Sequence, residues 1–386
     1  MKLHKIISVA ALGLAMASCS EEKLGPTIFP TEPEVKDPNG YTYKFDTWVE
    51  QNFRDPYNLE FKYKMEDIES DMKYNLVPAS FDKARDLCLL TKYLWFDTYN
   101  EHCGIDFLKS YGPRILHLIG SPAYNPNTGT EILGLAEGGL KVTLFKVNDM
   151  IIDDIWQLNE YYFRTMHHEF GHILHQTRTY PTEFNLLSIG RYDSGSWQSK
   201  PIGLMASQGF ITPYASSAQR EDFAETIANY LTRSQEQLDL IYWMAERGWT
   251  TGSDDAFNAE DSSYFCYYYC KDPSKPDERT YFLESVEKDE TYRPALIGEG
   301  GEYLHTVAEV EAYIEKMNNT KPGGVFPAPD NDTVDGREMI RRKQNIVRNW
   351  FKDAWELDFD GLRSIVQRRQ SDFDIEALRQ EIENVQ

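Results

Sequence analysis

A pair of histidines four residues apart, inside a long amphipathic segment, constrains this chain more than any other feature. Residues 168–172 read HEFGH, and the segment from about Ile155 to about Gln176 has the apolar period of a helix. Its apolar positions are Ile155, Leu158, Tyr162, Met166, Phe170, Ile173 and Leu174. On a helix, His168 and His172 share one face, one turn apart. Gly171 is a poor helix former, which indicates that another element or a substrate approaches it closely.

This spacing suits metal binding. Two imidazoles one turn apart can reach one tetrahedral Zn²⁺ at about 2.0–2.1 Å. Glu169, next to the first histidine, can then act on a metal-bound water as general base. The alternative is an ordinary exposed or core helix, because this pattern also arises by chance. A third ligand at a suitable place would favour the metal site.

One possible third ligand is a further histidine soon after the second, as in the metzincin pattern. This chain has His175 where that pattern needs glycine and Arg178 where it needs histidine, so that option fails. His175 lies near the face of His168 and His172. We interpret it as a helix-surface histidine or one that supports a ligand.

A second predicted helix, residues 219–231, offers acidic ligands. Its apolar stripe consists of Phe223, Ile227 and Leu231. Glu221 and Glu225 share a face, so Glu221 is expected to bind Zn²⁺ and Glu225 to accept the free ring N–H of a zinc-bound histidine. Asp222 is the main rival as ligand, but it points about 100° away from Glu221. The alternative for all three is a solvated acidic face.

Tyr214 stands just before this second helix. Its phenol could donate to the oxyanion of a tetrahedral intermediate. The alternative is a buried aromatic loop residue, because the chain has 24 tyrosines. Ser216 or Ser217 is expected to cap the helix.

These residues together resemble the gluzincins, and their spacing is similar to that of the catalytic domain of anthrax lethal factor. A wider resemblance is to the zinc metallopeptidase lipoproteins of Bacteroidetes, also called substrate import-associated zinc metallohydrolase lipoproteins. It is carried by WVEQNF at 48–53, PYNL at 56–59, AEGGLK at 136–141, HEFGH at 168–172 and EDFAE at 221–225. The resemblance implies that zinc is bound by His168, His172 and Glu221, with Glu169 as base and Tyr214 as oxyanion donor.

The N-terminus reads as a lipoprotein signal. Residues 1–18 have a basic start and a short apolar stretch, too short to span a membrane permanently. The sequence MASC that ends at Cys19 resembles a bacterial lipobox, so Cys19 is expected to be lipidated; cleavage after a small residue without lipidation is the alternative. Residues 19–40 read as a flexible tether. Ser20-Glu21-Glu22 resembles an export signal for surface lipoproteins, which favours an outer-membrane lipoprotein facing the exterior, with the periplasmic face as alternative.

Composition narrows the range of partners and the state of the cysteines. Asp and Glu number 62 against 40 Lys and Arg, a net charge of −22, and no basic stripe is present, which argues against nucleic acid as a partner. The expected compartment permits disulfides, and the natural local pairs are Cys88–Cys103 and Cys266–Cys270, although four cysteines allow three connectivities.

Residues 41–386 are expected to form an α+β, zincin-like metallopeptidase with a small mixed sheet and a helical C-terminal part. Its expected sections are an N-terminal α+β part at 41–150, catalytic helices at 151–250, an irregular insertion at 251–301 and C-terminal helices at 302–386. Smaller expected elements are strands at 59–63 and 115–119 and helices at 80–99, 235–247, 307–317, 337–355 and 360–367. Residues 137–144 are predicted to be the strand at the cleft edge that pairs with an extended peptide, or else an ordinary core strand.

The sequence thus predicts a lipid-anchored, cell-surface metallopeptidase with one Zn²⁺ per chain and a peptide or protein substrate. One alternative is a non-catalytic or weakly catalytic binding component of a nutrient-import system, with a TonB-dependent transporter as partner. The complete set of ligands, base and tyrosine argues against it. Another alternative is a zinc hydrolase of a non-peptide amide, which the same metal chemistry allows.

Overall fold

The structure is a computed structural model, and it describes residues 37–65, 75–125, 129, 131–132, 134–137, 141–252, 264–272, 274–275, 278–330 and 334–385. It divides into two compact units, Met1–Lys44 and Phe45–Gln386, and the second contains the elements discussed below apart from residues 43–44. The expected signal segment 1–18, Cys19 and the expected tether up to residue 36 lie outside the described residues. No helix among the described residues is long and apolar enough to cross a membrane.

A four-stranded mixed sheet forms the N-terminal part of the second unit. Its strands in spatial order are β1 (Glu60–Lys62), β2 (Ile115–Leu118), β6 (Lys141–Leu144) and β5 (Gly134–Glu137). β1, β2 and β6 run parallel, and β5 pairs antiparallel with β6. The expectation that residues up to Leu144 form the edge is therefore wrong, because β6 is an inner strand and β5 is the edge. β3 (Ala123–Tyr124) and β4 (Glu131–Ile132) form a separate pair.

The N-terminal part also contains several helical segments. The longest continuous helical run in it corresponds to the helix expected at residues 80–99. The run begins after Ser80 and continues to Cys103, with a π-helical stretch in its middle. It ends at Gly104, whose positive φ of 77° is accessible to glycine at little cost. The segments of this part are α2 (Tyr43–Val49), η1 (Glu50–Arg54), α3 (Asp55–Tyr57), α4 (Phe81–Leu90), η3 (Thr91–Phe96), α5 (Asp97–Cys103), α6 (Ile105–Tyr111) and η4 (Val147–Asp149).

The helix that carries HEFGH is one continuous helical run, close to the predicted bounds. It comprises α7 (Ile155–Leu158), the π-helical η5 (Asn159–Phe163) and α8 (Arg164–Thr177). Asp154 caps its start by accepting the backbone N–H groups of Trp156 and Gln157. The second predicted helix is α11 (Gln219–Thr232), and it packs directly on α8.

The segment between these helices folds into short turns of helix. They are α9 (Glu183–Leu187), η6 (Trp197–Ser199), α10 (Ile202–Ser207) and η7 (Tyr214–Ser217). The expected cap of α11 by Ser216 or Ser217 is wrong, because Ala218 holds the N-cap position. Ser216 instead donates its hydroxyl to the carbonyl oxygen of Pro213.

The expected irregular insertion at 251–301 contributes the central strands of an antiparallel sheet. The strand order is β11 (Tyr303–Leu304), β10 (Ala295–Ile297), β9 (Arg279–Val286), β8 (Tyr264–Cys270) and β12 (Val325–Pro327), and β7 (Thr250–Thr251) also pairs with β8. Helices α12 (Gln235–Ala245) and α13 (Val307–Thr320) share a second apolar core with this sheet. The expected disulfides are also absent: Cys88, Cys103, Cys266 and Cys270 are all free thiols.

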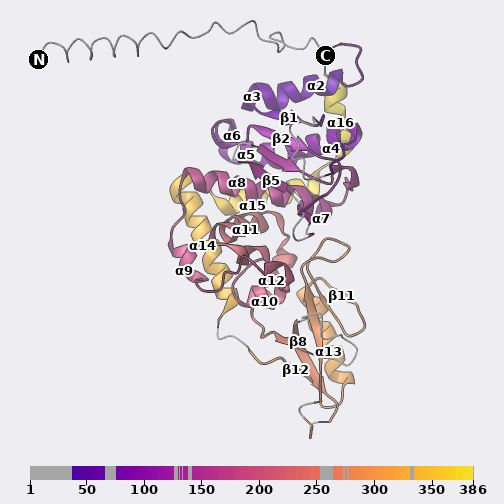
Figure 1. Cartoon of the computed structure of the whole chain (residues 1–386), viewed down its shortest axis with the longest axis vertical. Helices are drawn as coiled ribbons and strands as arrows, with labels where there is room; N and C mark the ends of the chain where they lie inside the picture. The colour runs from indigo at the N-terminus through magenta and orange to yellow at the C-terminus, as the bar shows by residue number, and fades with distance from the viewer. Residues whose placement is uncertain are drawn as a thin grey trace, which may run out of the picture. The chain divides into compact units, whose positions relative to one another are not determined.

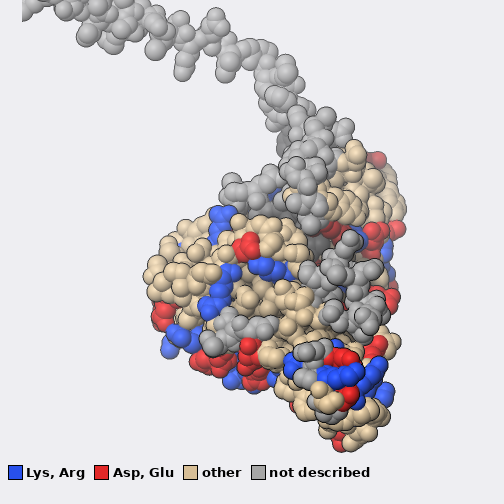
Figure 2. Space-filling model, turned by 60° about the horizontal axis from the view of Figure 1, so that its bottom comes forward, with Lys and Arg blue, Asp and Glu red and all other residues tan. Residues whose placement is uncertain are grey.

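Three C-terminal helices return toward the N-terminal part, as the yellow ribbons in Figure 1 show. They are α14 (Gly336–Trp355), α15 (Phe359–Asp372) and α16 (Ile375–Glu383). α14 and α15 pack on α11, and α16 packs on α4. On the molecular face drawn in Figure 2, Lys and Arg side chains are interspersed with Asp and Glu.

Candidate metal centre

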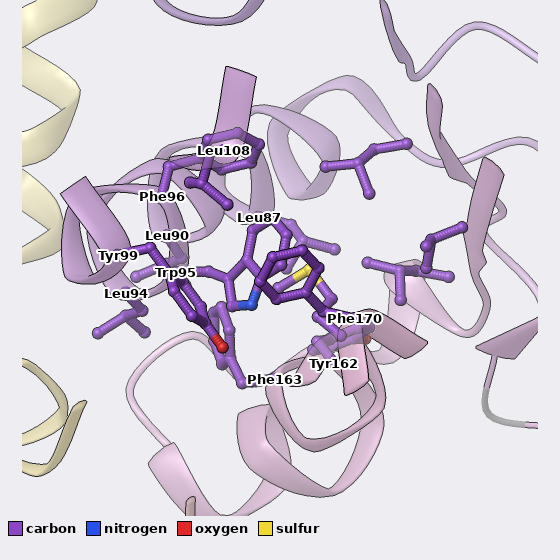
Figure 3. Packing of buried hydrophobic residues seen from close by; sticks show 14 of the residues in the cluster. Leu87, Leu90, Leu94, Trp95, Phe96, Tyr99, Leu108, Tyr162, Phe163 and Phe170 are labelled. Carbon is purple, nitrogen blue, oxygen red and sulfur yellow. The ribbon is translucent and has the colours of Figure 1, made fainter. Parts of the chain in front are cut away.

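Phe170 anchors the HEFGH helix in the largest apolar core. Its ring lies near Trp95 and Tyr99 (Figure 3). It meets both edge to face, with ring centroids 5.3 and 5.1 Å apart. Such edge-to-face contacts add about 0.5–1.5 kcal/mol each to the burial of the rings. With Phe170 fixed inward, the rotation of α8 is set, and with it the direction of the two histidines on its other face.

The small residue at position 171 lets α11 lie close to α8. A β-carbon at residue 171 would lie 3.6 Å from the backbone of Ala224 and 3.4 Å from the side chain of Ile227. The sequence prediction that another element approaches this glycine is therefore confirmed, and that element is α11. A larger side chain here would push α11 away from α8.

Three ligand-type atoms meet at the interface of these helices: His168 Nε2, His172 Nε2 and Glu221 Oε2. The two nitrogens are 3.0 Å apart, and they lie 3.3 and 3.1 Å from the carboxylate oxygen. Ligands bound to a tetrahedral Zn²⁺ at about 2.0–2.1 Å are roughly 3.3 Å from one another. Two imidazoles and one carboxylate are also the donor set of many catalytic zinc sites, so these residues fit the ion.

Glu225 lies one turn beyond Glu221 and contacts the other ring nitrogen of His168. Its Oε1 is 2.8 Å from His168 Nδ1, and its Oε2 accepts hydrogen bonds from the Thr212 hydroxyl at 2.6 Å and the Asn229 amide at 3.0 Å. Burial opposes the charge of Glu225, but the hydrogen bond from His168 and its other contacts hold its pKa at about 2. An ionised Glu225 fixes the proton of His168 on Nδ1 and leaves Nε2 directed at the cluster.

The charges within the cluster are strongly coupled. Burial opposes the charge of Glu221, yet its contacts with His168 and His172 hold its pKa well below the ordinary value. Burial likewise opposes a charged His168, but Glu221 and Glu225 raise its pKa to about 10. A metal ion bound at His168 Nε2 would displace the proton that this carboxylate pair favours.

Glu169 and Tyr214 complete the set expected from the sequence. Burial is the largest cause that raises the pKa of Glu169, and Glu221 and Glu225 add to it. Tyr214 places its hydroxyl 3.1 Å from Glu221 Oε2. Burial and the nearby carboxylates raise its pKa, so its phenol stays protonated and able to donate.

Asp222, the rival ligand, does not face the cluster. It is fully buried against Lys343, with its carboxylate 2.6 Å from the ammonium, and it accepts the hydroxyl of Tyr192 at 2.8 Å. The roles of Thr212, Asn229 and Lys343 as partners of Glu225 and Asp222 were not predicted from the sequence. The contact of Asn229 with Glu225 could have been predicted, because Asn229 follows Glu225 by four residues on the same helix face.

Known proteins that resemble this chain support a zinc-binding site. A family model described as "Putative zinc-binding metallo-peptidase" matches residues 39–272. The chain belongs to this family. The matched region contains both helices of the candidate metal centre.

The chain is also similar to the crystal structure of a "putative zinc-binding metallo-peptidase" from Bacteroides caccae ATCC 43185. The two share 30% sequence identity and a TM-score of 0.57, over 88% of this chain and 97% of that chain. A comparison with curated proteins gives no match. Family membership and the mixed α/β fold therefore agree with a zinc-dependent metallopeptidase.

Proposed function

We propose that this chain is a zinc metallopeptidase with a gluzincin-type, zincin-like active site that hydrolyses peptide bonds. The observation that carries the proposal is the triangle of His168 Nε2, His172 Nε2 and Glu221 Oε2, with sides of 3.0–3.3 Å. These three residues would hold the ion. When bound, Zn²⁺ lowers the pKa of a water and polarises a substrate carbonyl.

The surrounding residues then have separate tasks. The Glu169 carboxylate would take a proton from the attacking water and later deliver it to the leaving amine. Its raised pKa favours this transfer. Tyr214 would donate its phenolic proton to the oxyanion in a hydrogen bond. Glu225 holds the ring of His168, and Thr212 and Asn229 in turn hold Glu225.

A peptide substrate is favoured by the edge strand of the mixed sheet. β5 (Gly134–Glu137) is the terminal strand of the mixed sheet. An extended peptide can add to such an edge through main-chain hydrogen bonds. This replaces the earlier expectation for residues 137–144, whose members 138–140 lie outside the described residues.

For location, we propose a lipid anchor at Cys19 in the outer membrane, with the body facing the exterior or, alternatively, the periplasm. The support is the sequence MASC followed by Ser-Glu-Glu at 20–22. A neighbouring nutrient-import system is the proposed partner. Labelling of growing cells with a fatty-acid probe should mark wild type and leave Cys19→Ser unmarked; equal labelling would contradict the anchor.

The activity is tested with a mixed peptide library and mass spectrometry of the products. Zinc-loaded wild type should cleave, and Glu169→Gln should be about 10²–10⁴-fold slower while it keeps its zinc. Glu236→Gln, an exposed glutamate on α12, is the matched control and should cleave like wild type. Full activity of Glu169→Gln would contradict the assigned base. A zinc-loaded wild type that cleaves no peptide would favour an import-associated binding protein or a hydrolase of another amide.

A further inference from the structure

The two histidines of the cluster have different partners on their outer ring nitrogens. Nδ1 of His168 faces the Glu225 carboxylate, whereas Nδ1 of His172 is 2.8 Å from Nε2 of His175. A histidine that binds a metal through Nε2 carries its proton on Nδ1, and that proton needs an acceptor. His175 Nε2 is the acceptor that the structure provides for His172.

Aromatic contacts hold His175 in this position. Its ring meets Tyr180 edge to face at 5.4 Å and Phe223 at 6.0 Å. Tyr180 in turn stacks on Phe223, with the centroids 4.1 Å apart and the planes 11° apart. Phe223 stands two residues after Glu221 on α11. The same packing therefore fixes the His175 ring and the helix that supplies the carboxylate.

We infer that His175 is a positioning residue that holds the His172 ring with Nε2 directed at the zinc position, an inference that rests on the proposed metal centre. It is not a fourth ligand, because its Nε2 is directed at His172 Nδ1. A neutral imidazole suits this place, because it orients His172 without adding charge. A carboxylate there would add a fourth negative group to Glu169, Glu221 and Glu225.

Substitution of His175 tests the inference through zinc affinity, measured by competition with a chelator. His175→Leu removes the acceptor and should weaken zinc binding about 10–100-fold. His175→Gln retains an acceptor oxygen and should stay close to wild type. His305→Leu is the matched control, because His305 is also partly buried and pairs with Asp289 at 3.3 Å, far along the chain. It should bind zinc like wild type.

A second measurement separates orientation from general loss of structure. Co²⁺ in place of zinc reports ligand geometry in its visible spectrum, and that spectrum should change in His175→Leu and be restored in His175→Gln. A His175→Leu variant with wild-type affinity and spectrum would overturn the inference, as would a Gln variant as weak as the Leu variant. A wild type that binds no zinc would instead overturn the proposed function itself.

Discussion

His168 and Glu225 face each other across two antiparallel helices, with Nδ1 of the imidazole 2.8 Å from Oε1 of the carboxylate. One turn along, His172 faces Glu221 through its other ring nitrogen, with Nε2 3.1 Å from Oε2 of the carboxylate. Because both pairs repeat every four residues, the register of α8 against α11 is set by the site itself. The centre is therefore a product of helix periodicity and of the close approach at Gly171.

The contact between His168 and Glu225 predicts the effect of removing the carboxylate. Glu225→Ala should weaken zinc binding about 10–100-fold, because the His168 ring loses the acceptor that orients it. Chelator competition measures this. Glu236→Ala, on an exposed turn of α12, should leave the affinity unchanged. Equal affinities of Glu225→Ala and wild type would show that Glu225 does not support the ligand.

Gly171 predicts a graded response to side-chain size. Gly171→Ala should be neutral or stabilise the chain by up to about 1 kcal/mol, because its methyl group meets only ordinary contacts and alanine favours helix. Gly171→Leu should destabilise the fold by about 1–3 kcal/mol and weaken zinc binding, because α11 is displaced. Denaturant unfolding and zinc titration measure both effects. Tolerance of leucine with unchanged zinc affinity would contradict the packing account.

Much of this arrangement was predictable from local patterns, and the rest depended on long-range pairing. The helical run that ends in α8, residues 155–177, and helix α11 carry apolar stripes, and their bounds are close to those expected. The sheet of β8 and β9 was missed because the segment around it is rich in Gly, Asp and Pro, and its pairing joins residues far apart, such as Phe265 and Glu284. The position of β5 at the edge of the sheet, outside β6, is likewise not indicated by any local sequence pattern.

The helix cap and the cysteines show a related limit. Serine is a common N-cap residue, but the hydroxyl of Ser216 donates to the carbonyl oxygen of Pro213 in the preceding turn. It is therefore not used to cap α11. The cysteine pairs were chosen by proximity in sequence, which does not fix the geometry that a disulfide needs. The metal cluster was predictable because its spacing repeats with the helix turn.

The buried pair of Lys343 and Asp222 predicts a large effect on stability. Lys343→Met should cost about 3–5 kcal/mol, because the fully buried Asp222 loses the ammonium that pairs with its carboxylate. The double variant Lys343→Met with Asp222→Asn should recover much of the loss, because the unpaired charge is gone. Denaturant unfolding in the presence of a chelator measures both. A double variant less stable than Lys343→Met would contradict this explanation.

Glu160 predicts a dependence of stability on pH away from the metal. Burial opposes its charge, but Arg164 and Lys288 outweigh burial and lower its pKa from the ordinary value of 4.5. Its stabilising effect is thus present above pH 4.5 and is lost as the pH falls through the lowered folded-state pKa. Thermal unfolding of wild type and Glu160→Gln at several pH values should show wild type to be the more stable at neutral pH. The difference in stability should become smaller in acid. A gap that widens in acid would contradict the assignment.

The most direct test of the metal centre is zinc content by elemental analysis of the purified protein, with wild type beside Glu169→Ala and Glu221→Ala. The account predicts about one zinc per chain in wild type and in Glu169→Ala, and little in Glu221→Ala, because Glu221 supplies a ligand atom and Glu169 does not. Unchanged zinc in Glu221→Ala would contradict the assigned ligand. No zinc in wild type after reconstitution would contradict the central claim.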